Sequence, residues 1–247
     1  MDKLIYTAMT GASQVLQQQA TVSENLANAS TPGFRAALST FRAVPLVGEG
    51  LPTRSFVVDS TPGSDFTPAV FQPTGRDLDV AVSGAGWIAV QGPDGKEAYT
   101  RNGSFQISPA GVLQTRTGLN VMGESGPITI PPTSQITFAT DGTISTIPDG
   151  SQPNAITMIG SLKLVNPAAD QMERGGDGLF RLKNGATAPA DVNTQVVPGN
   201  LEGSNVNTVE ALVNMISLAR KFDMQMKMLT TADNDAKQAS SIMSIVG

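Results

Sequence analysis

The C-terminal stretch of the chain, residues 208–246, reads TVEALVNMISLARKFDMQMKMLTTADNDAKQASSIMSIV. Apolar residues recur in it at intervals of three or four, which is the period of one face of an α-helix. Asn207, followed three residues later by Glu210, is a suitable N-terminal cap. We therefore predict one continuous helix, on the order of 60 Å long at 1.5 Å per residue. Its predicted seam consists of Val209, Leu212, Ile216, Ala219, Phe222, Met226, Leu229, Ala232, Ala236, Ala239, Met243 and Val246.

The N-terminal residues 4–28 have the same periodicity and also predict a helix. Its remaining surface consists mainly of Gln, Ser, Thr and Asn, and Glu24 is the only charged residue between Lys3 and Arg35. A helix on the surface of a monomer normally has a charged outer face, so this composition indicates that neighbours enclose the helix. Pro32 and Gly33 predict that it ends between residues 28 and 33. The predicted seam consists of Ile5, Ala8, Ala12, Val15, Gln19, Val22 and Leu26.

The region between the two helices is rich in Gly, Pro, Thr and Val. Its first part carries widely spaced prolines and is predicted to be an extended connector. From Leu78 to about Val197, short apolar runs alternate with turn signals, which predicts a mainly β domain. The predicted fold class is α+β, with long N- and C-terminal helices that pair as a coiled-coil-like unit. The predicted parts are an N-terminal helix in 1–35, the connector in 36–75, a central β domain in 76–200 and a C-terminal helix in 201–247.

The composition of the 247-residue chain disfavours several classes of function. Its formal net charge is −5, so it lacks the basic stripe that binds a nucleic-acid backbone or an anionic membrane surface. It contains neither Cys nor His, which removes the thiol nucleophile, the usual general base and the commonest metal ligand. No apolar run is long enough to span a membrane, and the N-terminus lacks the pattern of a cleaved secretory signal. We therefore expect no enzyme activity, no catalytic residue, no cofactor, no metal, no membrane insertion and no cleaved signal peptide.

A few motifs have an enzymatic or binding interpretation beside a structural one. Asp77 and Asp79 share one face of a strand, as a pair of glycosidase carboxylates would, but we interpret them as solvated acids at a turn. The runs 84–86 and 175–178 are glycine-rich but lack the Lys or the spaced acids of phosphate and calcium loops, so both are predicted to be turns. For Trp87, a core position is expected instead of a sugar-stacking one.

The end of the N-terminal helix resembles the signature of flagellar rod and hook proteins. Residues 74–105 and 203–216 are similar to the central segment and to the start of the C-terminal helix of the same family. Within the flagellar basal-body rod family, the runs 41–45 and 86–91 are most similar to the proximal rod branch, and a distal rod or hook subunit is the alternative. The signature residues are Asn25, Leu26, Ala27, Asn28, Thr31, Pro32, Gly33, Phe34 and Arg35.

The resemblance implies a structural subunit of the periplasmic rod in the bacterial flagellar basal body. It also implies export through the flagellar type III apparatus and assembly with other rod proteins and with copies of itself. We expect the helices to form the inner wall of a tube that transmits torque, with the β domain outside. A periplasmic carbohydrate-binding β module with dimerising helices is the alternative from another class. The residues expected at the assembly interface are Ile5, Val15, Val22, Leu26, Leu212, Ile216, Phe222, Met226 and Leu229.

Overall fold

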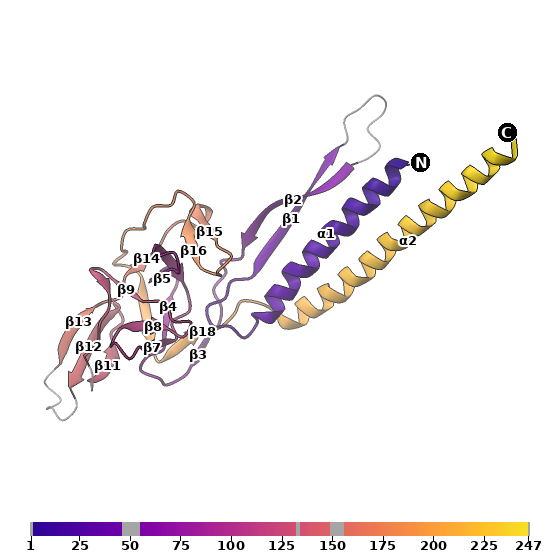
Figure 1. Cartoon of the computed structure of the whole chain (residues 1–247). Coiled ribbons are helices and arrows are strands. Elements are labelled where there is room, and N and C mark those ends of the chain that lie inside the picture. Colours follow the sequence, from indigo (N-terminus) through magenta and orange to yellow (C-terminus); the bar gives the residue numbers. More distant parts are fainter. Residues whose placement is uncertain (1, 46–54, 132–133, 149–155, 247) are drawn as a thin grey trace. The chain divides into compact units, whose positions relative to one another are not determined.

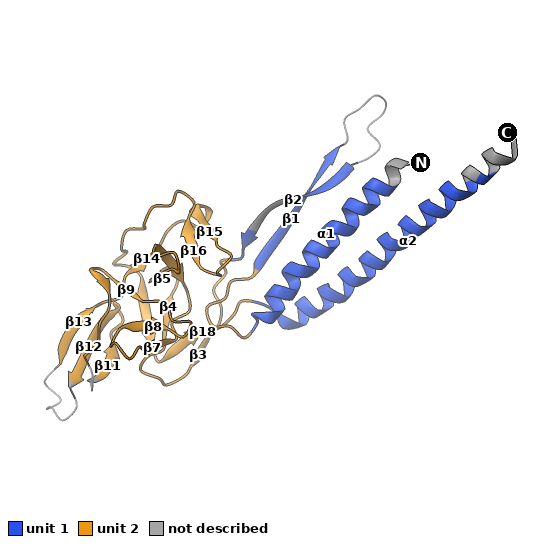
Figure 2. Ribbon diagram, viewed as in Figure 1, with its two compact units in different colours: residues 1–29, 37–65, 206–247 blue, residues 30–36, 66–205 orange. Residues whose placement is uncertain are grey.

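The computed structural model describes residues 2–45, 55–131, 134–148 and 156–246. The chain divides into two compact units, which Figure 2 shows in blue and orange. Unit 1 consists of residues 1–29, 37–65 and 206–247, and unit 2 consists of residues 30–36 and 66–205. The two ends of the chain therefore belong to one unit, and most of its middle belongs to the other.

Unit 1 contains both helices, α1 (Asp2–Ala27) and α2 (Thr208–Val246), which run antiparallel and pack against each other (Figure 1). Helix α1 ends at Ala27, one residue before the predicted range of 28–33 and ahead of the Pro-Gly pair. The predicted cap of α2 is confirmed, because Oδ1 of Asn207 accepts hydrogen bonds from the backbone N–H groups of Val209 (3.1 Å) and Glu210 (3.3 Å). Within the described residues, neither helix has an apolar stretch sufficient to cross a membrane.

An antiparallel hairpin completes unit 1. It consists of β1 (Ala37–Pro45) and β2 (Ser55–Ser64), and both strands pack against α1. Residues 36–75 are thus not simply the extended connector expected from their prolines, although residues 46–54 lie outside the described part. Along β1, partly buried residues such as Ser39 and Phe41 alternate with exposed ones such as Leu38. Both faces of β1 carry polar and apolar side chains, so the polarity of the residues does not indicate which face is buried. Packing against α1 determines which residues are buried.

Unit 2 is built of short strands around buried apolar side chains. One sheet has five strands in the order β14-β5-β6-β16-β15, and another has three in the order β11-β12-β13. The larger core cluster includes Ile88, Phe105 and Leu113, and a second cluster surrounds Trp87 and Tyr99. The fold of the chain is therefore α+β, with a mostly β central region.

The remaining elements of the described chain all lie in unit 2. They are β3 (Phe71–Pro73), β4 (Val80–Ser83), β5 (Trp87–Gln91), β6 (Glu97–Thr100), β7 (Phe105–Ile107), β8 (Leu113–Thr115), β9 (Met122–Gly123), β10 (Gly126–Pro127), β11 (Ser134–Phe138), β12 (Thr143–Pro148), β13 (Thr157–Ser161), β14 (Leu164–Val165), the 3-10 helix η1 (Ala169–Gln171), β15 (Met172–Arg174), β16 (Phe180–Leu182), β17 (Gln195–Pro198) and β18 (Asn200–Glu202).

Candidate assembly interface

Helix α1 has an inner and an outer apolar face. The inner face contains the buried residues Ala8, Ala12 and Val15, and the other predicted seam residues, Ile5, Gln19, Val22 and Leu26, are partly buried. The outer face consists of exposed residues that also recur at intervals of three and four, and none of them is charged. They are residues 6, 9, 13, 16, 20, 23 and 27. Its large apolar members, Tyr6, Met9 and Leu16, are exposed.

Helix α2 contacts α1 through a different set of positions from the predicted seam. Its buried and partly buried residues are spaced alternately by four and three, which is a heptad pattern. The predicted seam shares only Phe222, Leu229, Ala232 and Ala236 with this face, whereas Met226 and the seam residues before Phe222 are exposed. The side chains of Ala239, Met243 and Val246 lie outside the described part. The residues of the inner face are Ala211, Met215, Leu218, Phe222, Gln225, Leu229, Ala232 and Ala236.

The opposite side of α2 carries an exposed apolar patch. At 3.6 residues per turn, residues 209, 213 and 216 lie about half a turn from residues 211, 215 and 218. Ile216 is 57% exposed and Leu212 is 48% exposed. Of the predicted interface residues, α2 thus turns Leu212, Ile216 and Met226 toward solvent and keeps Phe222 and Leu229 partly buried. We call Val209, Leu212, Val213 and Ile216 the outer patch of α2.

The acidic pair in unit 2 is not arranged for catalysis. Asp77 is exposed, whereas Asp79 is buried and accepts hydrogen bonds from Nη1 of Arg76 (3.0 Å) and Oγ of Ser104 (3.2 Å). The interpretation of Asp79 as a solvated acid is therefore wrong, since the sequence does not reveal that Ser104 and its strand cover this residue. Its carboxylate is held in a structural ion pair.

The other motifs are structural in unit 2. Trp87 is 5% exposed, and its ring lies 4.5 Å from that of Phe180, so the core position is confirmed. Residues 84–86 form the turn between β4 and β5, and residues 175–178 form a turn that a backbone hydrogen bond closes. No group of three or more His, Cys, Asp or Glu suitable for a metal ion occurs among the described residues.

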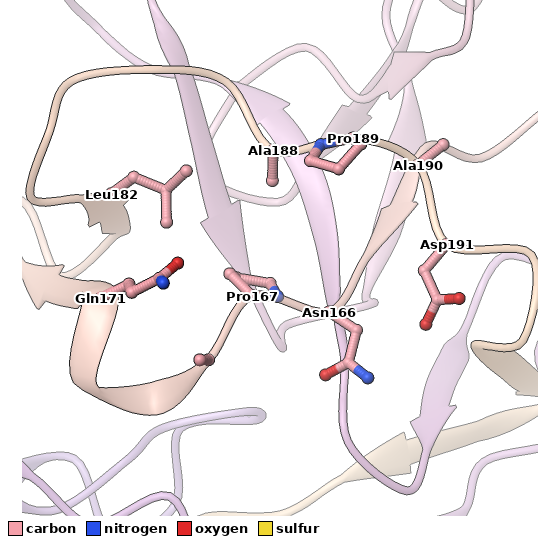
Figure 3. A pocket seen from close by; sticks show the side chains of 9 residues that line it. Asn166, Pro167, Gln171, Leu182, Ala188, Pro189, Ala190 and Asp191 are labelled. Carbon is pink, nitrogen blue, oxygen red and sulfur yellow. The ribbon is translucent and has the colours of Figure 1, made fainter.

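A pocket of about 400 Å³ lies in unit 2 (Figure 3). Leu182 and Gln171 line it on one side and Asn166 and Asp191 on the other. Hydrogen bonds from the backbone N–H of Asn193 (3.0 Å) and from other donors already occupy the Asp191 carboxylate and hold its pKa below the usual range. The pocket therefore offers two amides and a carboxylate that is bonded within the chain, which is not an arrangement for catalysis.

A fully buried ion cluster is the site that sequence reasoning missed. Nη2 of Arg35 lies 2.7 Å from Oε1 of Glu202, and Nη1 of Arg101 lies 3.0 Å from Oε2 of the same carboxylate. Burial lowers the pKa of the Arg101 guanidinium, and the attraction of Glu202 opposes that shift. Arg35 and Arg101 both lie in segments that the sequence singles out. Nothing in the local sequence marks Glu202, because its partners are 167 and 101 residues away along the chain.

Comparison with known proteins assigns the chain to a family. Sequence models described as "Flagella basal body rod protein", "Flagellar hook protein FlgE/F/G D1 domain" and "Flagellar basal body rod FlgEFG protein C-terminal" match residues 5–35, 81–146 and 197–242. The flagellar basal-body rod proteins FlgF of Salmonella typhimurium and Escherichia coli are each 50% identical to it, over 99% of this chain and 100% of theirs. The chain belongs to the flagellar basal-body rod protein family.

The flagellar rod family also includes FlgG, and the FlgG relatives are less similar to this chain than the two FlgF proteins of 50% identity. FlgG of Buchnera aphidicola subsp. Acyrthosiphon pisum is 32% identical, over 90% of this chain and 92% of its own. The full-length match at 50% identity makes the chain FlgF-like, as the resemblance to the proximal branch predicted. Each of the three matched segments contributes one residue to the buried cluster, namely Arg35, Arg101 and Glu202.

Proposed function

We propose that this chain is a structural subunit of the proximal flagellar rod, which transmits torque through the periplasm. The full-length identity to FlgF proteins supports the position in the rod. The observation that carries the mode of assembly is that α1 exposes Tyr6, Met9 and Leu16 and that α2 exposes its outer patch. Exposed apolar surfaces of this kind mark sites of association.

The two faces favour an open assembly over a closed dimer. The outer patch of α2 and the exposed residues Tyr6, Met9 and Leu16 of α1 belong to different helices and are not equivalent. Contacts between non-equivalent patches on successive subunits generate an open helix when the rotation between subunits does not close into a ring. We infer that α1 and α2 pair in a coiled-coil-like manner and that these outer faces bind copies of the chain or other rod proteins.

We further propose that the chain reaches the periplasm through the flagellar type III export apparatus. Membership of the flagellar rod family supports this route.

Replacement of Ile216 by Asp tests the function. Ile216 is exposed in the free chain, so Ile216→Asp should leave the fold of the subunit intact. In the proposed contact, however, the substitution buries an unpaired carboxylate, which costs several kcal/mol. We expect secreted, folded protein that is absent from basal bodies, in cells that do not swim. Val192→Asp, at a 92% exposed position of unit 2, is the matched control and should support motility. Normal motility of the Ile216→Asp cells would refute the proposal.

The carbohydrate-binding alternative has less support. Trp87 is buried in the core, and the described pocket has no aromatic side chain in its lining. That alternative also requires dimerising helices and hence a defined small oligomer. Light scattering at rising concentration separates the two, because a rod subunit has no fixed end point of association.

A further inference from the structure

Unit 2 joins the rest of the chain through three short stretches, which we call the connecting segments. They are residues 30–36, 66–69 and 202–205, next to the boundaries between the two units. Any force that travels along the chain between the helices and the β unit has to enter unit 2 through these segments. How firmly they are attached to the β unit therefore matters for a subunit that carries torque.

Glu202 lies in the third connecting segment and binds the other two. Its carboxylate Oε1 accepts a hydrogen bond from Nη2 of Arg35 (2.7 Å) and another from the backbone N–H of Ala69 (2.9 Å). Its backbone carbonyl accepts a hydrogen bond from the N–H of Gly33 (2.8 Å). One residue of the third segment is thus bonded to the first segment twice and to the second once.

Arg101 attaches this cluster to the folded sheet. Its Nη1 donates to Oε2 of Glu202 (3.0 Å) and to the carbonyl of Val82 (3.2 Å), and its Nη2 donates to the carbonyl of Gly84 (2.6 Å). Val82 belongs to β4, so the guanidinium links the carboxylate to the end of a core strand. The connecting segments are therefore bonded to one another and, through Arg101, to the core.

Asn205 adds a second, uncharged link. Its Oδ1 accepts a hydrogen bond from the backbone N–H of Ala36 (2.7 Å), and its Nδ2 donates to the carbonyl of Thr67 (3.2 Å). These bonds again join the third connecting segment to the first and to the second.

Burial makes the cluster rigid. The side chains of Arg35 and Glu202 are 0% exposed, and that of Arg101 is 4% exposed. Water cannot replace a bond that breaks there, and removing one partner leaves a charge buried and uncompensated. The segments consequently cannot loosen one bond at a time without a large loss of stability.

We propose that Glu202 is a positioning residue that fixes the connecting segments to the β unit, so that torque passes through the subunit without peeling them away. This inference rests on the proposed rod function and goes beyond it. It assigns load transfer within one subunit to one carboxylate, which is fully buried in unit 2.

The first test is amide hydrogen exchange on the purified full chain with Glu202→Gln. The amides of Gly33, Ala36 and Ala69 should exchange at least about 100-fold faster, while those of β5 and β6 change little. Glu97→Gln is the matched control, because Glu97 forms an ion pair with Nζ of Lys163 (2.7 Å) in the same unit but binds no connecting segment. Equal exchange at the three amides in both variants would overturn the proposal.

The second test is swimming under load. Cells with Glu202→Gln should incorporate the subunit into basal bodies, swim normally in dilute medium and slow down more than the wild type as viscosity rises. Cells with Glu97→Gln should not show this dependence on load. Equal load dependence in the two variants would contradict the inference. It would also be contradicted if only the Glu202→Gln subunit were missing from basal bodies, because that result would give Glu202 a role in assembly.

Asn205→Ala keeps the inference testable if Glu202→Gln fails to fold. It removes the links to Ala36 and Thr67 without leaving a buried charge, so it should produce the same load dependence to a smaller degree. Unchanged exchange and motility in this variant would count against the proposal. Failure of the rod function itself is recognised separately, because the wild-type chain would then be missing from basal bodies while the exchange result could still hold.

Discussion

Gly11 of α1 lies directly against Gln225 of α2. A Cβ atom added to Gly11 would lie 3.3 Å from both Cδ and Nε2 of the Gln225 side chain. Gln225 is the one polar residue of the inner face of α2. In this contact the smallest residue of α1 therefore lies against the polar residue of that face. The end of the Gln225 side chain therefore occupies the space beside Gly11.

A larger residue at position 11 should push the helices apart. We expect Gly11→Leu to cost about 1–3 kcal/mol through overpacking, and Gln225→Ala in the same chain to recover much of that loss. Thermal unfolding followed by circular dichroism at 222 nm, applied as a double-mutant cycle, measures the coupling. Additive effects would show that the two residues do not share a layer.

Two leucines on opposite faces of α2 distinguish pairing from assembly. Leu218 is buried against α1 and Leu212 is exposed. Leu218→Asp should lower the helix content of the unassembled chain, because it buries an unpaired carboxylate at a cost of several kcal/mol. Leu212→Asp should leave the helix content unchanged and reduce incorporation into rods. The reverse result would mean that α2 pairs through the seam predicted from its sequence.

Gly33 in the family signature should tolerate no side chain. Its φ is +70°, and an added Cβ would lie within 2.3 Å of the backbone carbonyl carbon of Arg101. Gly75 has nearly the same φ, +68°, with nothing within 4 Å, and is the matched control. We expect Gly75→Ala to cost about 1 kcal/mol from backbone strain alone, and Gly33→Ala about 3 kcal/mol or more. Urea unfolding followed by the fluorescence of Trp87, the single Trp of the chain, reports the difference.

Tyr99 should make unit 2 sensitive to alkali. Its hydroxyl donates to Oε1 of Glu97 (2.9 Å) and accepts from the N–H of Ala188 (2.6 Å), and burial raises its pKa from 10.0 to about 12. Between these values the unfolded chain binds fewer protons than the folded chain, so the free energy of unfolding falls as pH rises from 10 to 12. Urea unfolding at several pH values should show this slope in the wild type and a shallower one in Tyr99→Phe. Identical slopes would contradict the assignment.

Local patterns in the sequence predict the ends of the helices and the mainly β middle. Asn207 caps α2 and α1 ends before Pro32, because such signals act through neighbouring backbone groups. Which face of α2 packs against α1 was not predictable in the same way, because two faces of the helix have apolar residues at intervals of three or four. One face carries Val209, Leu212 and Ile216, and the other carries Ala211, Met215 and Leu218. Two apolar faces on one helix leave the choice to whichever partner packs against it.

The hairpin of β1 and β2 and the environment of Asp79 show the same limit. The prolines of residues 36–75 are visible in the sequence, but the surface of α1 that partly buries Phe41 is not. The surroundings of Asp79 likewise depend on Ser104, which is 25 residues away.

The sequence by itself determined that this chain has two long helices at its ends, a β region between them and membership of the flagellar rod family. These features rest on periodicity, capping and motifs, which act over a few residues. Only the tertiary structure decided which face of α2 meets α1 and that Arg35, Arg101 and Glu202 form one buried cluster. The physical reason is that packing and ion pairing join residues far apart in the chain, so no local pattern records them.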